Sequence, residues 1–267
     1  MTSTLYSDLK TIRVEATREV AQSSPDHNVP WGTRRDNSRN WRFNQKLNKL
    51  YAKKKGPLAV LDLGCSGGGF VKDCLDDGGL AVGLEGSDFS KKRRRAEWRT
   101  IPEYLFTADI TAPFQVYGEF ESGSKPLKFD VVTSWEVIEH ISEQDLIPVS
   151  ENVAKHLDRG GIWIMSVSPN IEIIDGIHLH QTVQPKSWWI RKFEQLGWIN
   201  LETHLHYFNT QFVRGPKYGA PGSFHLILTR EVAQTPAIPE ESLPVRIYDS
   251  WLGSGPQRLL KLLIAGL

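Results

Sequence analysis

Two carboxylates and an imidazole lie close together in the segment Glu136-Val137-Ile138-Glu139-His140. Residues spaced i, i+3 and i+4 share one face of a helix or helical turn, so the three side chains would lie side by side there. An imidazole with a pKa near ~6.5 can remove a proton at neutral pH. The three groups could instead hold a divalent metal that lowers the pKa of a hydroxyl. A third interpretation is that they only support a bound ligand or cap a helix.

A glycine-rich loop, Leu61 to Phe70 (Leu-Asp-Leu-Gly-Cys-Ser-Gly-Gly-Gly-Phe), follows a short apolar run. Glycines let the backbone approach a ligand closely, and the helix that follows offers free N–H groups. A phosphate-binding P-loop needs a Lys-Ser or Lys-Thr pair after its last glycine, which this loop lacks. A dinucleotide site needs glycine where Ser66 stands. The remaining ligand class carries an ammonium group that would lie near Asp62.

Further acids follow two later apolar runs. Glu85 and Gly86 follow the run 80–84, and Asp109 and Ile110 follow the run 104–107. An acid about 20 residues after a glycine loop, at the end of the second strand, can accept hydrogen bonds from both ribose hydroxyls. The loop and Glu85 together therefore indicate a site for a ribose-containing ligand.

The segment Asp62 to Gly68 resembles motif I of class I S-adenosylmethionine-dependent methyltransferases, whose common form is Asp-Leu-Gly-Cys-Gly-Thr-Gly; Ser66 and Gly67 depart from it. The segment 129–140 resembles the motif IV region of ubiquinone-type O-methyltransferases, where Glu-Val-x-Glu-His is common. The resemblance covers about residues 57–170. It implies an α/β fold with a Rossmann-like, doubly wound sheet of seven strands in the order 3-2-1-4-5-7-6, the last strand in sequence being antiparallel.

The same resemblance implies S-adenosylmethionine as the cofactor and assigns residues to it. The implied cofactor residues are Asp62, Gly64, Cys65 and Gly68 near the methionine end, Glu85 and Gly86 at the ribose, Asp109 and Ile110 at the adenine, and Trp135 and Glu136.

For catalysis, we predict His140 as general base with Glu139 beside it and no metal. Small-RNA 2′-O-methyltransferases have a similar Glu-x-x-Glu-His and a later His, which leaves a divalent metal possible. The alternative ligand set is Glu136, Glu139, His140 and His178, with His180 as the other choice of histidine.

The predicted acceptor contacts are His178, His180, Trp188 and Trp189, because methyltransferase relatives often carry a His and then a helix over the active site. We expect O-methylation of a small molecule or glycan. Metal-assisted RNA 2′-O-methylation and a non-catalytic S-adenosylmethionine-binding protein are the alternatives.

Apolar and helical segments alternate in a way that would position these residues. Apolar runs occur at 58–61, 80–84, 104–107, 129–133 and 162–167, with helical patterns over 70–77, 89–98 and 146–157. Such alternation is typical of βαβ units around a parallel sheet. A helix over 186–196 and two strands, 198–204 and 223–230, follow. Because only a loop joins these two strands, one of them must run antiparallel.

We predict an N-terminal arm over 1–42, a methyltransferase domain over 43–232 and a C-terminal tail over 233–267. Within the tail, the Leu-rich stretch 259–264 is expected to be a packing helix, too short to span a bilayer.

Charge and cysteine content exclude several protein classes. Lys and Arg total 32 against 31 Asp and Glu, so there is no global field to attract nucleic acid, and the basic run 91–95 is expected to be a solvated helix face. Two cysteines exclude a disulfide scaffold and a four-cysteine zinc site. Without an apolar run of signal-peptide or membrane-spanning length, we expect a cytoplasmic protein without stable membrane insertion. The sequence does not indicate an oligomeric state.

Overall fold

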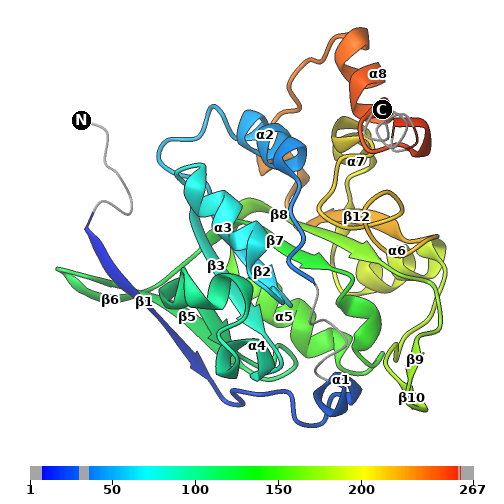
Figure 1. The fold of residues 1–267 in the computed structure, drawn as a ribbon. Helices are drawn as coiled ribbons and strands as arrows, with labels where there is room; N and C mark the ends of the chain where they lie inside the picture. Colours follow the sequence, from blue (N-terminus) through cyan, green and yellow to red (C-terminus); the bar gives the residue numbers. More distant parts are fainter. Residues whose placement is uncertain (1–7, 30–35, 258, 260–267) are drawn as a thin grey trace, which may run out of the picture.

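The computed structural model describes residues 8–29, 36–257 and 259, and a seven-stranded sheet forms its centre (Figure 1). The strands are β2 (Ala59–Leu63), β3 (Leu80–Glu85), β4 (Leu105–Thr107), β7 (Phe129–Trp135), β8 (Leu157–Val167), β11 (Ile199–Asn200) and β12 (Phe224–Thr229). Their order across the sheet is β11-β12-β8-β7-β2-β3-β4. The five strands from β8 to β4 pair in parallel, whereas β12 runs antiparallel to β8 and β11. The predicted Rossmann-like fold and its strand order are confirmed.

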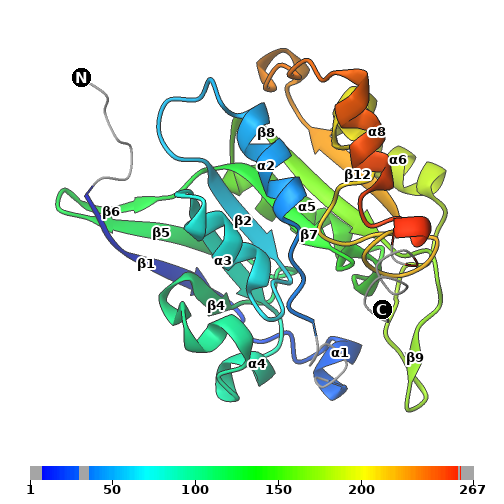
Figure 2. The ribbon, with the colours of Figure 1, turned by 45° about the horizontal axis from the view of Figure 1, so that its top comes forward.

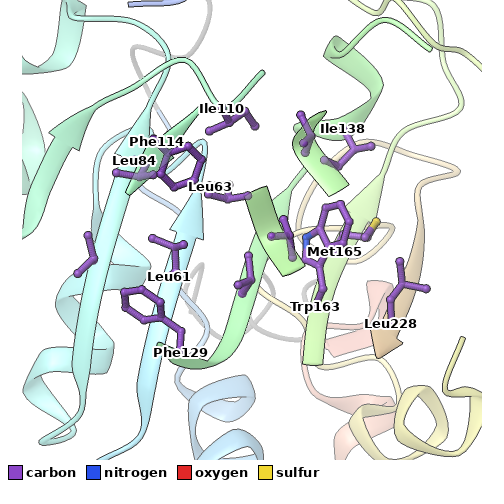
Figure 3. Packing of buried hydrophobic residues seen from close by; sticks show 14 of the residues in the cluster. Leu61, Leu63, Leu84, Ile110, Phe114, Phe129, Ile138, Trp163, Met165 and Leu228 are labelled. Carbon is purple, nitrogen blue, oxygen red and sulfur yellow. The ribbon is translucent and has the colours of Figure 1, made fainter. Parts of the chain in front are cut away.

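Helices cover both faces of this sheet (Figures 1 and 2). Those on one face are α2 (Trp41–Leu50), α3 (Gly69–Asp76) and α7 (Glu202–Phe208), and those on the other are α5 (Leu146–His156) and α6 (Lys186–Gln195). Successive residues of one strand belong to different cores: Val131 packs with the first group and Val132 with the second. Figure 3 shows the second core, where Phe129 and Trp163 pack beside the central strands. Burial on both faces explains why the strands are continuous apolar runs.

A second, antiparallel sheet of three strands extends beside the first (Figure 1): β1 (Leu9–Ala16), β5 (Phe114–Phe120) and β6 (Gly123–Pro126). The predicted N-terminal arm thus contains a strand, because its alternate residues, such as Ile12 and Val14, pack on the core while those between them face solvent. The boundary at residue 42 stays a prediction.

Two other segments differ from expectation. The predicted helix 89–98 is a short α4 (Phe89–Lys92), a turn and a 3-10 helix (Ala96–Arg99), so the basic run 91–95 is not one helix face. The predicted strand 198–204 shortens to β11 at the edge of the sheet, and the chain continues as α7 from Glu202.

The remaining elements are α1 (Pro25–Asn28), β9 (Ile173–Ile174), β10 (Ile177–His178) and α8 (Leu243–Trp251). The buried Lys46 of α2 anchors the C-terminal tail, since its Nζ lies 2.8 Å from Asp249 Oδ2 and 2.7 Å from Glu241. Apart from Leu259, the predicted helix 259–264 lies outside the described residues. Among the described residues, no helix is both long and apolar enough to cross a membrane.

Candidate active site

A cavity of about 990 Å³ lies at the carboxyl ends of the central parallel strands. Gly64 follows β2, Glu85 ends β3, Asp109 follows β4 and Trp135 ends β7, and all four line the cavity. Open α/β sheets bind ligands at this edge. The volume is at the upper end of the ~300–1,000 Å³ typical of ligand sites, which leaves room for a cofactor and a small acceptor.

The glycine loop forms one end of this cavity, which we call the cofactor end. Gly64 has φ +70°, and a Cβ there would lie 2.4 Å from Val137 Cγ2, so no other residue fits without a shift. The backbone N–H of Ser66 donates to Glu85 Oε2 at 2.7 Å. Burial raises the pKa of Glu85. The carboxylate that ends β3 therefore also fixes the loop after β2.

Trp135 contributes an unusual donor to the wall. Its side chain is 6% exposed, and its indole Nε1–H has no hydrogen-bond partner among the described residues. Buried donors are nearly always paired, so this N–H is an exception in a residue that lines the cavity.

Asp109 and Ile110 line the cavity as predicted, but the Asp109 carboxylate is already bound by protein groups. Oδ1 accepts from the N–H and hydroxyl of Thr111, at 2.9 and 2.7 Å, and Oδ2 lies 3.1 Å from Arg18 Nε. The segment that follows β1 thus holds the wall expected beside adenine, a contact that the sequence did not reveal.

Several predicted site residues lie outside the cavity wall as the described residues form it; they are Asp62, Cys65, Gly68, His178, Trp188 and Trp189. Asp62 accepts from Thr133 Oγ1 at 2.6 Å, which ties β2 to β7, and burial raises its pKa to about 8. Cys65 is a core residue, and Gly68 is the N-cap of α3 with φ 84°.

The predicted acceptor contacts are only partly brought together. Trp189 is fully buried in the core against Phe193, and Trp188 packs against the same core, so neither is placed to stack on an acceptor. His178 is exposed on β10, whereas His180 lines the cavity.

Glu136 does not share a face with Glu139 and His140, which corrects the expected i, i+3, i+4 arrangement. Its φ of 53° interrupts the turn, and the 3-10 helix begins only at Ile138. The Glu136 carboxylate instead pairs with Arg214 Nη2 at 2.6 Å, and Arg214 also lies 3.0 Å from Asp36 Oδ1. Glu136 therefore joins the strand end to two distant segments.

Another part of the cavity wall, which we call the acceptor end, contains Glu139 and His140. Glu139 Oε1 accepts the N–H of Ser168 at 2.7 Å, while Oε2 has no partner among the described residues. The side chain is fully buried, and burial raises its pKa to about 7.

His140 is held by the N-terminal segment, since its Nδ1–H donates to Asp26 Oδ2 of α1 at 3.0 Å. Burial lowers the pKa of His140, but the hydrogen bond and charge of Asp26 outweigh it and raise the pKa to about 9. Nothing in the pattern around Asp26 singles it out, because its partner lies more than a hundred residues away.

A second histidine lies beside the first. The rings of His140 and His180 are 4.6 Å apart between centroids and nearly perpendicular. His180 Nδ1–H donates to the carbonyl of Asn170 at 2.5 Å, and His180 Nε2 lies 3.1 Å from Glu172 Oε2. Glu172, like Asp26, was not predicted as a site residue.

The sequence of residues 34–214 matches a family described as a methyltransferase domain. The chain belongs to this family. It is an S-adenosylmethionine-dependent methyltransferase, as the motifs indicated. The match does not separate subgroups, so the ubiquinone-type resemblance stays a prediction. A search of curated proteins found no match.

Solved methyltransferase structures show similarity to the chain at low sequence identity. Magnesium protoporphyrin IX methyltransferase from Synechocystis PCC 6803 has a TM-score of 0.46 and 16% identity, over 71% of this chain and 81% of that one. A sugar N-methyltransferase from Streptoalloteichus has a TM-score of 0.45 and 14% identity, over 77% and 92%. 1,6-Didemethyltoxoflavin-N1-methyltransferase from Burkholderia thailandensis has a TM-score of 0.47 and 12% identity, over 76% and 83%. None of these similarities assigns an acceptor to this chain.

The cofactor end fits S-adenosylmethionine on its own geometry. Gly64 has a positive φ and no Cβ, so the loop backbone is open to a ligand at this position. The unpartnered indole N–H of Trp135 can donate to a carboxylate. Glu85 accepts backbone hydrogen bonds from Ser66, at 2.7 Å, and Ser87, at 3.3 Å, and each carboxylate oxygen retains a lone pair for a hydroxyl donor.

Proposed function

We propose that this enzyme transfers the methyl group of S-adenosylmethionine to a hydroxyl oxygen of a small molecule or glycan. The observation that carries the proposal is one cavity with two unlike ends. Gly64 and Glu85 belong to its cofactor end, and Glu139, His140 and His180 to its acceptor end.

Within this proposal, the cofactor lies along the carboxyl ends of the strands. The loop backbone at Gly64 and the Trp135 indole hold the methionine portion, Glu85 with Gly86 binds the ribose, and Ile110 packs on the adenine. Asp109 acts there through its contact with Arg18. When bound, the cofactor supplies a methyl group activated by a sulfonium.

Residues of the acceptor end assist the loss of the acceptor's hydroxyl proton. The acceptor oxygen bonds to the methyl carbon as the carbon–sulfur bond breaks with its electron pair on sulfur, and the hydroxyl proton leaves. His140, fixed by Asp26, and Glu139, with its unpartnered Oε2, are the groups that we place at this hydroxyl. Positioning supplies most of the rate in such a transfer, and proton removal typically adds ~10²–10⁴-fold.

A small acceptor suits the charge around the cavity better than RNA does. In the described part of the chain, the basic run 91–95 is divided between α4 and a turn, and its last member, Arg95, is half-buried. Arg95 donates to Ser66 Oγ at 2.9 Å and to the carbonyl of Asp36 at 2.7 Å, so it supports the loop. The other four cations, Lys91 to Arg94, are exposed, but they lie on a short helix and a turn and not along one helix face.

The test is turnover with isotopically labelled S-adenosylmethionine and a metabolite extract, followed by identification of the labelled product. We expect an O-methylated small molecule or sugar, formed at least roughly 100-fold more slowly by the His140→Ala variant. A label on nitrogen would contradict the hydroxyl acceptor, and cofactor binding without transfer to any acceptor would leave a non-catalytic binding protein.

A further inference from the structure

We propose that His140, Glu172 and His180 form a binding site for a divalent transition-metal cation at the acceptor end. One possible ligand atom from each residue lies within 4.8 Å of those of the other two. The site differs from the set suggested by the sequence, since Glu136 is bound to Arg214 and His178 is exposed outside the cavity. The existence of the site is independent of the proposed function, whereas its role in catalysis rests on it.

Both imidazoles are oriented as metal-binding histidines usually are. Such histidines donate one ring N–H to a carboxylate or a backbone carbonyl, which fixes the tautomer and leaves the other nitrogen for the metal. His140 donates from Nδ1 to the Asp26 carboxylate, and His180 donates from Nδ1 to the Asn170 carbonyl. Nε2 is therefore the nitrogen left to His140, whereas a cation bound by His180 Nε2 would replace its present contact with Glu172 Oε2.

Two backbone segments hold the three proposed ligands near one another. His140 ends the 3-10 helix after β7, while Glu172 and His180 flank the β9–β10 hairpin. The hairpin pairs Ile173 with His178, and the N–H of Leu179 donates to the Glu172 carbonyl at 2.9 Å, which keeps the flanking residues adjacent. Figures 1 and 2 show α1, which supplies Asp26, at the same end of the molecule as this hairpin.

The spacing requires only a small closure around an ion. Ligands bound at 2.0–2.1 Å in tetrahedral geometry lie about 3.3 Å apart. The His180 Nε2–Glu172 Oε2 distance is already 3.1 Å. The Glu172 side chain is 45% exposed and can adjust, whereas the His180 side chain is 5% exposed and is held in place.

The three ligands determine which metal the site prefers and how many coordination positions stay open. Two imidazoles and one carboxylate favour zinc and similar transition metals over magnesium or calcium, which prefer oxygen ligands. Three protein ligands leave at least one coordination position, as in catalytic zinc sites. An acceptor hydroxyl bound in that position would have a lowered pKa, which assists loss of its proton during transfer.

The direct test is calorimetric titration of chelator-treated protein with Zn²⁺, with Mg²⁺ as the comparison ion. We expect one Zn²⁺ per chain and much weaker Mg²⁺ binding. Glu172→Gln and His180→Asn should each weaken Zn²⁺ binding on the order of 100-fold, and Asp26→Asn, which removes an orienting partner, by roughly 10–100-fold.

The matched control is His178→Gln, which changes an exposed histidine of the same hairpin and should leave Zn²⁺ affinity unaltered. Thermal unfolding of each metal-free variant checks its fold, and the exposed Glu172 makes Glu172→Gln the variant expected to fold normally. Wild-type Zn²⁺ affinity in a folded Glu172→Gln variant, or no stoichiometric binding by the wild-type chain, would show that the site does not exist.

The catalytic role is tested separately with the labelled product identified above. Chelation should abolish methyl transfer and Zn²⁺ should restore it; full transfer by metal-free enzyme would overturn the role. One Zn²⁺ bound at these residues without any methyl transfer would instead support the site and contradict the proposed function.

Discussion

The two ends of the cavity are built in different ways. At the cofactor end, Gly64 and Glu85 lie at the ends of consecutive strands, and the N–H of Ser66, in the loop after Gly64, donates to the Glu85 carboxylate. At the acceptor end, α1, the turn after β7 and the β9–β10 hairpin each contribute a side chain that pairs with one from another segment. The first end is thus determined by local backbone geometry, and the second by contacts between distant segments.

This difference suggests which end can vary. A sheet edge with a fixed glycine loop preserves binding of one cofactor, whereas inserted segments can change shape without disturbing the sheet. The predictions below test whether the two ends are as separable in function as they are in construction.

The largest expected effect is at the acceptor end. His140→Ala should lower turnover at least roughly 100-fold, because it removes the imidazole that we place at the acceptor hydroxyl and that would also hold the proposed cation. Affinity for S-adenosylmethionine should change little, since the cofactor residues are untouched. Steady-state kinetics with calorimetry measure both; a parallel loss of cofactor affinity would mean that the two ends are not separable.

The reciprocal change is Glu85→Ala at the cofactor end. It should weaken S-adenosylmethionine binding by roughly 1–3 kcal/mol, the usual value of hydrogen bonds to a charged group. Asp88→Asn is the matched control, because Asp88 lies just beyond the same strand and pairs with the exposed Lys92. Calorimetric affinities equal in both variants would remove Glu85 from the cofactor site.

A third prediction concerns the pH dependence of stability, which arises from a histidine outside the site. His156 is fully buried, donates from Nδ1 to the Asn152 carbonyl and accepts from the N–H of Val116; burial lowers its pKa to about 4. Between pH ~6.5 and 4, His156 is therefore protonated in the unfolded chain but neutral in the folded chain. The free energy of unfolding falls as the pH falls through this range.

By pH 5 this one histidine should cost about 2 kcal/mol of unfolding free energy. Urea unfolding near neutral pH and near pH 5 measures the loss, and His156→Gln should flatten the dependence. An unchanged slope in that variant would assign the acid sensitivity to other groups.

The smallest effect is expected at His178. The sequence predicted it as an acceptor contact, but in the structure it is exposed and outside the cavity wall. His178→Ala should change stability by no more than about 0.5 kcal/mol, as for most surface substitutions. Turnover should stay near that of the wild type. A large loss of turnover with normal folding would return His178 to the acceptor end.

The sequence predicted the features that depend on local order. Strands buried on both faces appear as continuous apolar runs, and Gly64, Glu85 and Ile110 follow such runs, so the sheet and the cofactor end could be located. Periodicity could not show that Glu136 adopts a positive φ and turns toward Arg214. The segment 201–204 was predicted as part of a strand, although it begins α7. Short segments of this kind cannot be assigned from periodicity, because helix and strand propensities overlap in them.

Contacts between remote segments were not predictable from one sequence. Asp26, Glu172 and Arg214 are single charged residues that belong to no recognisable motif, and they matter only because folding brings each beside a partner. Trp189 shows the opposite error: an aromatic pair near a predicted site suggested an acceptor contact, but the hydrophobic effect places this large ring in the core.

The pairing of β1 with β5 has a consequence for the order in which the chain folds during its synthesis. Residues 9–16 leave the ribosome first, yet their partner strand, 114–120, follows about a hundred residues later. At roughly 5–20 residues per second, that is a delay of about 5–20 s. Asp26 must wait longer still for His140. The last residues of the acceptor end therefore emerge from the ribosome after the glycine loop and Glu85.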